Sequence, residues 1–317
     1  MELRLVFKAL GFFLLVGIGI PGNIIILLKF THLKITEKKL LPANLILTML
    51  ALVNILVVLS RGIPQSLTAI GITDIFHDYE CKCFIYVYRV CRAMSICVTS
   101  LLSCYQCIVI APATSVWLFL KRKVTPNVTV VIFFLWGINL SIYPSCILYS
   151  YAMNNSSMSE YTLNLEFCYV AFSTYTIFVA NGSVFACRDF LFVGLMMLAS
   201  CYIVVILHRH RKQVQGIRSS DRNPGRTAEY QAARSVVLLV TFYVLLFGLD
   251  SAIWLYTLLL SRVGPMVTDA RVFFGSLYTA VSPIIIILTN KSLQAPRQYT
   301  RKKILLHSPE TTCSQVQ

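Results

Sequence analysis

Long apolar runs alternate with short polar segments along the whole chain. The runs with at most one charged residue cover residues 9–28, 40–59, 93–120, 128–149, 190–207, 235–261 and 272–290. A helix needs roughly 20 largely apolar residues to cross the hydrocarbon layer of a membrane. The pattern therefore predicts an all-α membrane protein with a single seven-helix transmembrane domain over residues 1–317. The helices are expected at about 7–30, 41–71, 83–112, 126–149, 189–209, 234–260 and 271–290.

One further stretch, residues 161–186, is apolar enough to be considered as an eighth span. It contains Asn164, Glu166 and Asn181, lacks basic flanks and is rich in threonine and aromatic residues. These features favour a folded loop, so we expect a long second extracellular loop over 151–188. The polar segment 208–233 is expected to form a basic third cytoplasmic loop.

Composition excludes an ordinary soluble protein. Hydrophobic residues make up 57% of the chain and charged residues 13%, whereas a soluble globular chain carries roughly 25% charged residues. A water-soluble fold of this size would expose too much apolar surface. The net charge of +15 would suggest a nucleic-acid partner in a soluble protein, so its meaning here depends on where the charges lie.

The basic residues are concentrated on one side of the predicted membrane. With seven spans, 19 of the 28 lysines and arginines follow the first, third, fifth and seventh helices. Lysine and arginine in short loops mark the cytoplasmic side, so we expect the N-terminus outside and the C-terminus inside. The excess charge then lies beside anionic lipid headgroups. Membrane lipid is therefore an expected partner, and nucleic acid is not.

No sequence pattern favours catalysis, and we expect neither an enzyme nor a bound metal or cofactor. His208 and His210 are two residues apart and do not share a helical face, as a pair of metal ligands on one helix would. The usual motifs of serine hydrolases, zinc proteases and P-loop nucleotide binders are missing. Many transporters consist of two related halves, which seven spans do not provide. A receptor is therefore the favoured class, with a transporter as the alternative.

Several short segments carry a family signature. The second helix ends in LSRGIPQ (59–65), the third contains SLLSCYQ (100–106) followed by IAP (110–112), and the fifth opens on Arg188-Asp189 and closes on HRHRKQVQ (208–215). The third helix lacks Asp-Arg-Tyr, and the seventh carries VSP (281–283) without the common Asn-Pro-x-x-Tyr. With these segments the chain resembles the vomeronasal type 1 receptors, including the related fish olfactory receptors. Bitter taste receptors are the alternative family.

The resemblance implies a chemosensory G-protein-coupled receptor in the plasma membrane of sensory neurons. Its ligand would be a small-molecule pheromone or odorant, and its partner a heterotrimeric G protein of the inhibitory class. The resemblance also implies a disulfide between Cys81 and Cys168, with Cys83 as a competitor of Cys81. Two overlapping glycosylation sequons begin at Asn154 and Asn155 in the expected outer loop, and one of them is expected to be modified.

Charged residues within spans indicate a binding pocket. Such charges are costly in a membrane and usually face a cavity or one another. Arg89 lies about 12 Å below Cys81 and shares one face of the third helix with Arg92. The expected ligand-binding residues are Tyr88, Arg89, Arg92, Asp189, Asp250 and Trp254. The alternative is an internal ion pair, such as Asp250 with Arg92, that only fixes helix packing. An arginine left unpaired would favour an anionic ligand.

The expected G-protein face lies at the cytoplasmic ends of the third to fifth helices. A ligand would act by favouring a state in which this end of the bundle is open. Most of the basic residues here are also explained by membrane topology alone. The residues expected to face the G protein are Gln106, Lys121, Arg122, His208, Arg209, Arg211 and Lys212.

Overall fold

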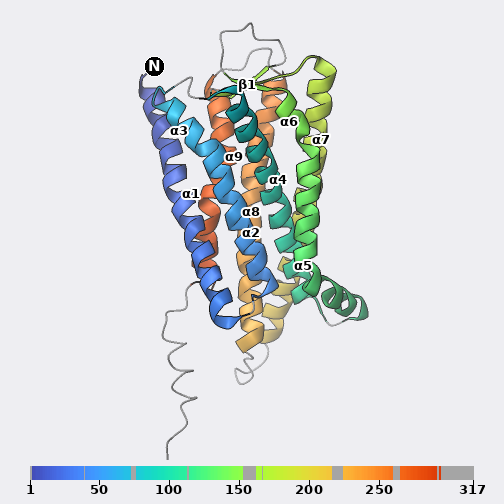
Figure 1. Cartoon of the computed structure of the whole chain (residues 1–317). Helices are drawn as coiled ribbons and strands as arrows, with labels where there is room; N and C mark the ends of the chain where they lie inside the picture. Colours follow the sequence, from blue (N-terminus) through green and yellow to red (C-terminus); the bar gives the residue numbers. More distant parts are fainter. Residues whose placement is uncertain are drawn as a thin grey trace, which may run out of the picture.

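Seven long helices run side by side in the computed structural model of the chain (Figure 1). The structure describes residues 2–38, 40–72, 76–112, 114–152, 162–165, 167–215, 224–259, 265–290 and 293. Within these residues, seven helices are long and apolar enough to cross a membrane. The hydrophobic pattern therefore predicts the number of spans correctly, and the bundle is mostly helical as expected.

The first two spans differ in their regularity. Helix α1 runs continuously over Glu2–Glu37, longer than the expected 7–30, with Pro21 inside it. Helix α2 covers Pro42–Val57, passes through the π-helical turn η1 at Val58–Gly62 and continues as α3 over Ile63–Ala69. A π-helical turn closes i→i+5 hydrogen bonds and is rare. Here it lies within the second span and contains Arg61.

Helix α4, over Asp78–Ile110, is the most buried span and packs against α2, α5, α7 and α8. Its first turn is closed by a capping box, in which the backbone N–H of His77 donates to Glu80 Oε2 at 2.9 Å. Such a box satisfies backbone donors that have no partner within the helix. The central helix therefore has a defined start, five residues before the expected 83.

Helix α5 covers Ser115–Ile142 and is followed by the short α6 at Pro144–Leu148. It begins well before the expected 126, so Lys121, Arg122 and Lys123 lie within a helix and not in a loop. Apolar residues at 116–120 extend the helix beyond the basic triplet. The first turns of α5, dark green at the lower right, point sideways away from the other helices (Figure 1).

The expected loop over 151–188 is wrong in its second half. Helix α7 begins at Tyr175 and continues to Gln215, so Asp189 lies well inside a helix instead of opening one. Helix α8 covers Pro224–Leu259 and α9 covers Pro265–Thr289. The expected loop 208–233 is likewise helical at both ends, since only residues 216–223 separate α7 from α8.

A small sheet lies across the end of the bundle that carries the first turn of α4. Its strands are β1 at Ser150–Ala152, β2 at Thr162–Asn164 and β3 at Cys168–Ala171. The order is β1-β3-β2 with antiparallel pairs, and Ala152 lies opposite Cys168. We call this the disulfide end, because Cys81 of α4 is bonded to Cys168 of β3 there. The end that carries Lys121, Arg122, Arg209 and Lys212 is the basic end.

Buried amide and hydroxyl groups connect four spans in the middle of the bundle. Asn54 of α2 accepts a hydrogen bond from Ser95 of α4 at 2.8 Å and donates to Ser282 of α9 at 3.0 Å. Asn23 of α1 donates to the backbone carbonyl of Thr279 at 3.0 Å. Polar groups in a membrane protein interior need such partners. These bonds fix the register of α1, α2, α4 and α9 below the site described next.

Candidate ligand-binding site

Asp250 of α8 is the acidic centre of a charged cluster toward the disulfide end. Its Oδ2 lies 2.6 Å from Nη2 of Arg92 on α4, and its Oδ1 lies 3.5 Å from Nε of Arg271 on α9. The Asp250 side chain is only 9% exposed. The carboxylate therefore connects three helices, and the internal ion pair considered from the sequence is present.

The same cluster extends from Arg92 to the second span. Nη1 of Arg92 donates to the Tyr88 hydroxyl at 3.2 Å. Cζ of Arg61 lies 5.2 Å from the centroid of the Tyr88 ring and 5.5 Å from that of Phe167. Arg61 is 4% exposed, and its Nε has no hydrogen-bond partner among the described residues. The guanidinium of Arg61 is therefore held by cation–π contacts with two rings. A carboxylate would bind it more strongly than these rings do.

A small cavity adjoins the ion pair, with a volume of about 20 Å³. Its lining includes Arg92, Tyr243, Asp250, Phe274 and Tyr278. A cavity of this size holds about one water molecule, so a ligand of odorant size enters only if side chains or helices move. Gly275 of α9 leaves room for the guanidinium here, since a Cβ at this position would lie 3.2 Å from Arg92 Nη1.

Two of the expected pocket residues lie in other surroundings. Cζ of Arg89 is 5.8 Å from the ring centroid of Phe185 on α7. Asp189 forms an ion pair with its neighbour Arg188, whose Nη1 also donates to Asn139 of α5 at 3.0 Å. These contacts join α4, α5 and α7, on the side away from α9. The structure therefore brings Tyr88, Arg92 and Asp250 into direct contact, whereas Arg89 and Asp189 make their direct contacts with other residues.

The set of residues expected at this site from the sequence was incomplete. Trp254 belongs to α8, but its side chain lies outside the described part of the structure. Arg271, Tyr243 and Tyr278 are additional members that sequence reasoning missed. The expected helix 271–290 places Arg271 at its outer end, whereas the observed start at Pro265 places it inside the helix. Pro265 itself was the available signal for this earlier start, because proline is favoured in the first turn of a helix.

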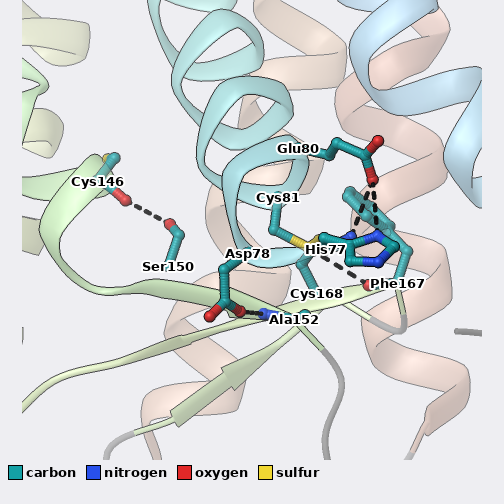
Figure 2. Close-up of a disulfide and its surroundings, with 9 residues drawn as sticks. All are labelled: His77, Asp78, Glu80, Cys81, Cys146, Ser150, Ala152, Phe167 and Cys168. Carbon is teal, nitrogen blue, oxygen red and sulfur yellow. Dashed lines mark hydrogen bonds and ion pairs between the residues drawn. A yellow bond between two sulfur atoms is a disulfide. The ribbon is translucent and has the colours of Figure 1, made fainter. Parts of the chain in front are cut away.

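The disulfide anchors the small sheet above this cluster. The Cα atoms of Cys81 and Cys168 are 5.8 Å apart, and Cys83 is an exposed free thiol, so the pairing implied by the family resemblance is present. Figure 2 shows Asp78 accepting a hydrogen bond from the backbone of Ala152, at 2.7 Å. Phe167 precedes Cys168 and reaches Arg61. The loop is thereby tied to the charged cluster.

The two expected glycosylation sites, Asn154 and Asn155, lie outside the described residues.

The residues expected to face a G protein have different surroundings at the basic end. Gln106 is 5% exposed and therefore lies inside the bundle in this conformation. Lys121, Arg122, His208, Arg209 and Lys212 are exposed. The side chain of Arg211 lies outside the described residues. Within the described part of the chain, no group of three or more His, Cys, Asp or Glu residues is arranged to hold a metal ion.

Comparison with known proteins identifies the family. The model of the vomeronasal organ pheromone receptor family matches residues 8–298. The chain is 40% identical to olfactory receptor class A-like protein 1 of Danio rerio, with 93% of each chain covered. It is 31% identical to vomeronasal type-1 receptor 45 of Mus musculus, over 89% of this chain and 88% of that one.

Among solved structures, the fold is similar to that of squid rhodopsin. The TM-score is 0.69 at 17% sequence identity, covering 100% of this chain and 89% of the other. This likeness concerns the fold alone. The match to the family model and the two relatives decide between the families considered from the sequence. The chain belongs to the vomeronasal organ pheromone receptor family and is a multi-pass membrane protein with the seven-helix fold of G-protein-coupled receptors.

Proposed function

We propose that this chemosensory receptor detects a small anionic pheromone or odorant at the disulfide end and activates an inhibitory-class heterotrimeric G protein at the basic end. The disulfide end faces the outside, since disulfides persist in oxidising compartments and basic segments favour the cytoplasm. The receptor resides in the plasma membrane of sensory neurons, where one of Asn154 and Asn155 is glycosylated.

The observation that supports an anionic ligand is that the charged cluster contains more arginines than acids. Arg61, Arg92 and Arg271 are linked by the contacts above, and Asp250 is the acid that these contacts include among the described residues. Desolvated guanidinium groups without a carboxylate partner favour a negatively charged ligand. Arg61 is the receiving group in this proposal, because Arg92 and Arg271 already share Asp250.

The site also offers a route from ligand to G protein. Asp250 holds α8 to α4 and α9 through the two arginines. An anion bound at Arg61 disturbs Tyr88, which accepts a hydrogen bond from Arg92, and so weakens the attachment of Arg92 to Asp250 and shifts the population toward a state with α8 displaced. The exposed His208, Arg209 and Lys212 at the end of α7 then contact the G protein. Gln106 becomes accessible only in that open state.

The test is a screen of matched compounds on cells that express the receptor with a reporter G protein. Small carboxylic acids are compared with their methyl esters, on wild type, Arg61→Gln and a control, Lys82→Gln. Lys82 lies at the same end but contacts the Tyr151 ring, outside the cluster. We expect acids to activate and esters not to, and Arg61→Gln to raise the half-maximal concentration at least about tenfold.

Two results would contradict the proposal. One is an Arg61→Gln receptor with normal surface delivery and an unchanged response to every active compound. The other is a set of active compounds that are all neutral. A receptor function also requires ligand-dependent guanine-nucleotide exchange without ligand flux across liposomes that contain the purified protein.

A further inference from the structure

The first turns of α5 leave the bundle at the basic end, and they expose large apolar side chains next to basic ones. Residues 115–123, here called the α5 N-segment, point sideways in Figure 1. The apolar side chains Val116, Leu118 and Phe119 are 71%, 52% and 65% exposed. Lys121, Arg122 and Lys123 follow directly and are also exposed. The segment thus combines an apolar turn with a basic turn.

One contact attaches this segment to the bundle and sets which side faces away. The Trp117 ring stacks on Tyr202 of α7, with ring centroids 5.4 Å apart. Val116 and Phe119 are three residues apart, so they share another face of the helix, and both remain uncovered. Nζ of Lys123 lies 5.9 Å from the Phe119 ring centroid, so the charge stays beside the apolar surface.

This order of residues is unfavourable in water and favourable at a bilayer surface. The apolar turn lies beyond the basic triplet as seen from the span, so a straight helix would carry Val116 and Phe119 past the headgroups into solvent. A segment that lies along the interface instead places apolar side chains at the acyl boundary. Basic side chains next to it are attracted to anionic headgroups.

We propose that the α5 N-segment is a binding surface for anionic phospholipid, with Lys121 and Arg122 on the headgroup and Val116 and Phe119 in the interface. The sideways direction and the charge complementarity favour the bilayer over a soluble partner, which would approach the bundle end itself. For Lys121 and Arg122 this assignment replaces the expected contact with a G protein. It does not depend on the ligand or on the proposed anion site.

The experiment measures lipid retention by the purified full-length receptor in mixed micelles of phosphatidylserine and phosphatidylcholine. Native mass spectrometry gives the ratio of the two bound lipids. We expect wild type to prefer phosphatidylserine and Lys121→Gln/Arg122→Gln to reduce that preference about tenfold. The matched control, Arg209→Gln/Lys212→Gln, removes two exposed charges from the same end of the molecule and is expected to change it less than about twofold. Equal losses in both pairs would overturn the proposal.

Two further measurements test the apolar turn and provide a result that does not depend on the folding of a variant. Val116→Ser/Phe119→Ser keeps the charges and is expected to lower retention of both lipids. A photoactivatable phosphatidylserine on the wild-type receptor is expected to crosslink within residues 115–123, and adducts that lie only elsewhere would overturn the proposal without any variant. Reduced nucleotide exchange by Lys121→Gln/Arg122→Gln in membranes of phosphatidylcholine alone would also overturn it, because that result assigns the segment to the G protein.

Discussion

At the residue scale, the shortest ion-pair contact of the charged cluster is the one between Asp250 and Arg92. Their oxygen and nitrogen are 2.6 Å apart, with side chains 9% and 24% exposed. Removing one partner of such a pair leaves the other charge desolvated and costs about 3 kcal/mol. We therefore expect Asp250→Asn to lower the thermal unfolding temperature of the purified receptor.

A double-mutant cycle separates this pairing from unrelated damage. Arg92→Gln and Asp250→Asn together are expected to destabilise less than the sum of the single changes, with a coupling of about 1–3 kcal/mol. Strictly additive effects would show that the two charges do not stabilise each other.

Gly275 gives a second prediction at the residue scale. A Cβ here would lie 3.2 Å from Arg92 Nη1 and 3.8 Å from Asp250 Oδ1. We expect Gly275→Ala to displace the guanidinium and to destabilise the receptor by about 1 kcal/mol. The control is Gly248→Ala on α8, where a Cβ meets nothing within 4 Å, and where alanine is expected to stabilise the helix slightly. Thermal unfolding of both variants checks the difference, and equal shifts would argue against crowding at Arg92.

The pairing of Arg92 with Asp250 also shows what sequence alone can decide. Charges inside spans are rare enough that Arg92 and Asp250 are found from the pattern. Helical periodicity fixes which face of one helix a residue occupies, but not which residue of a neighbouring helix lies opposite. The identity of the residue that pairs with Arg92 therefore required the structure.

At the element scale, the contact between α1 and α9 depends on a missing side chain. A Cβ at Gly22 would lie 2.9 Å from Cγ of Pro283, which is too close without a shift of the helices. We expect Gly22→Ala to cost about 1–3 kcal/mol and to reduce surface delivery. Gly17→Ala on the same helix meets nothing within 4 Å and serves as the control. A Gly22→Ala receptor as stable as the Gly17→Ala receptor would contradict this account of the α1–α9 contact.

The hydrophobic pattern predicts the ends of some helices wrongly. Residues 175–188 look like a loop, because Asn181 interrupts an apolar stretch that is rich in threonine and aromatic residues, and Arg188 follows it. In the bundle these polar side chains face partners, since Asn181 accepts a hydrogen bond from Ser145 at 3.0 Å and Arg188 binds Asn139. A polar residue inside a membrane helix is tolerated when another helix satisfies it. The pattern records the polarity of a residue but not the polarity of its neighbours.

At the scale of the whole molecule, one covalent bond holds the sheet on the bundle. Cys81 and Cys168 are separated by 87 residues, and removal of such a crosslink typically costs about 2–5 kcal/mol. We expect Cys81→Ser to lower the unfolding temperature and the ligand response together. Cys83→Ser removes a nearby exposed thiol and is expected to change neither. A Cys83→Ser receptor as impaired as Cys81→Ser would show that the pairing is not the one described.

The π-helical turn in the second span has a consequence for how this receptor and its relatives diverge. A π-helical turn holds one residue more than an α-helical path would need. Deleting one residue from 58–62 would let the span continue as a regular α-helix, and the segments on either side of the turn would keep their faces. Only the residues within the turn, Arg61 among them, would change their positions. If Arg61 receives the ligand as proposed, a single-codon deletion here would keep the fold and change which molecules are detected, and gene lineages that differ in length at this turn should differ in ligand class.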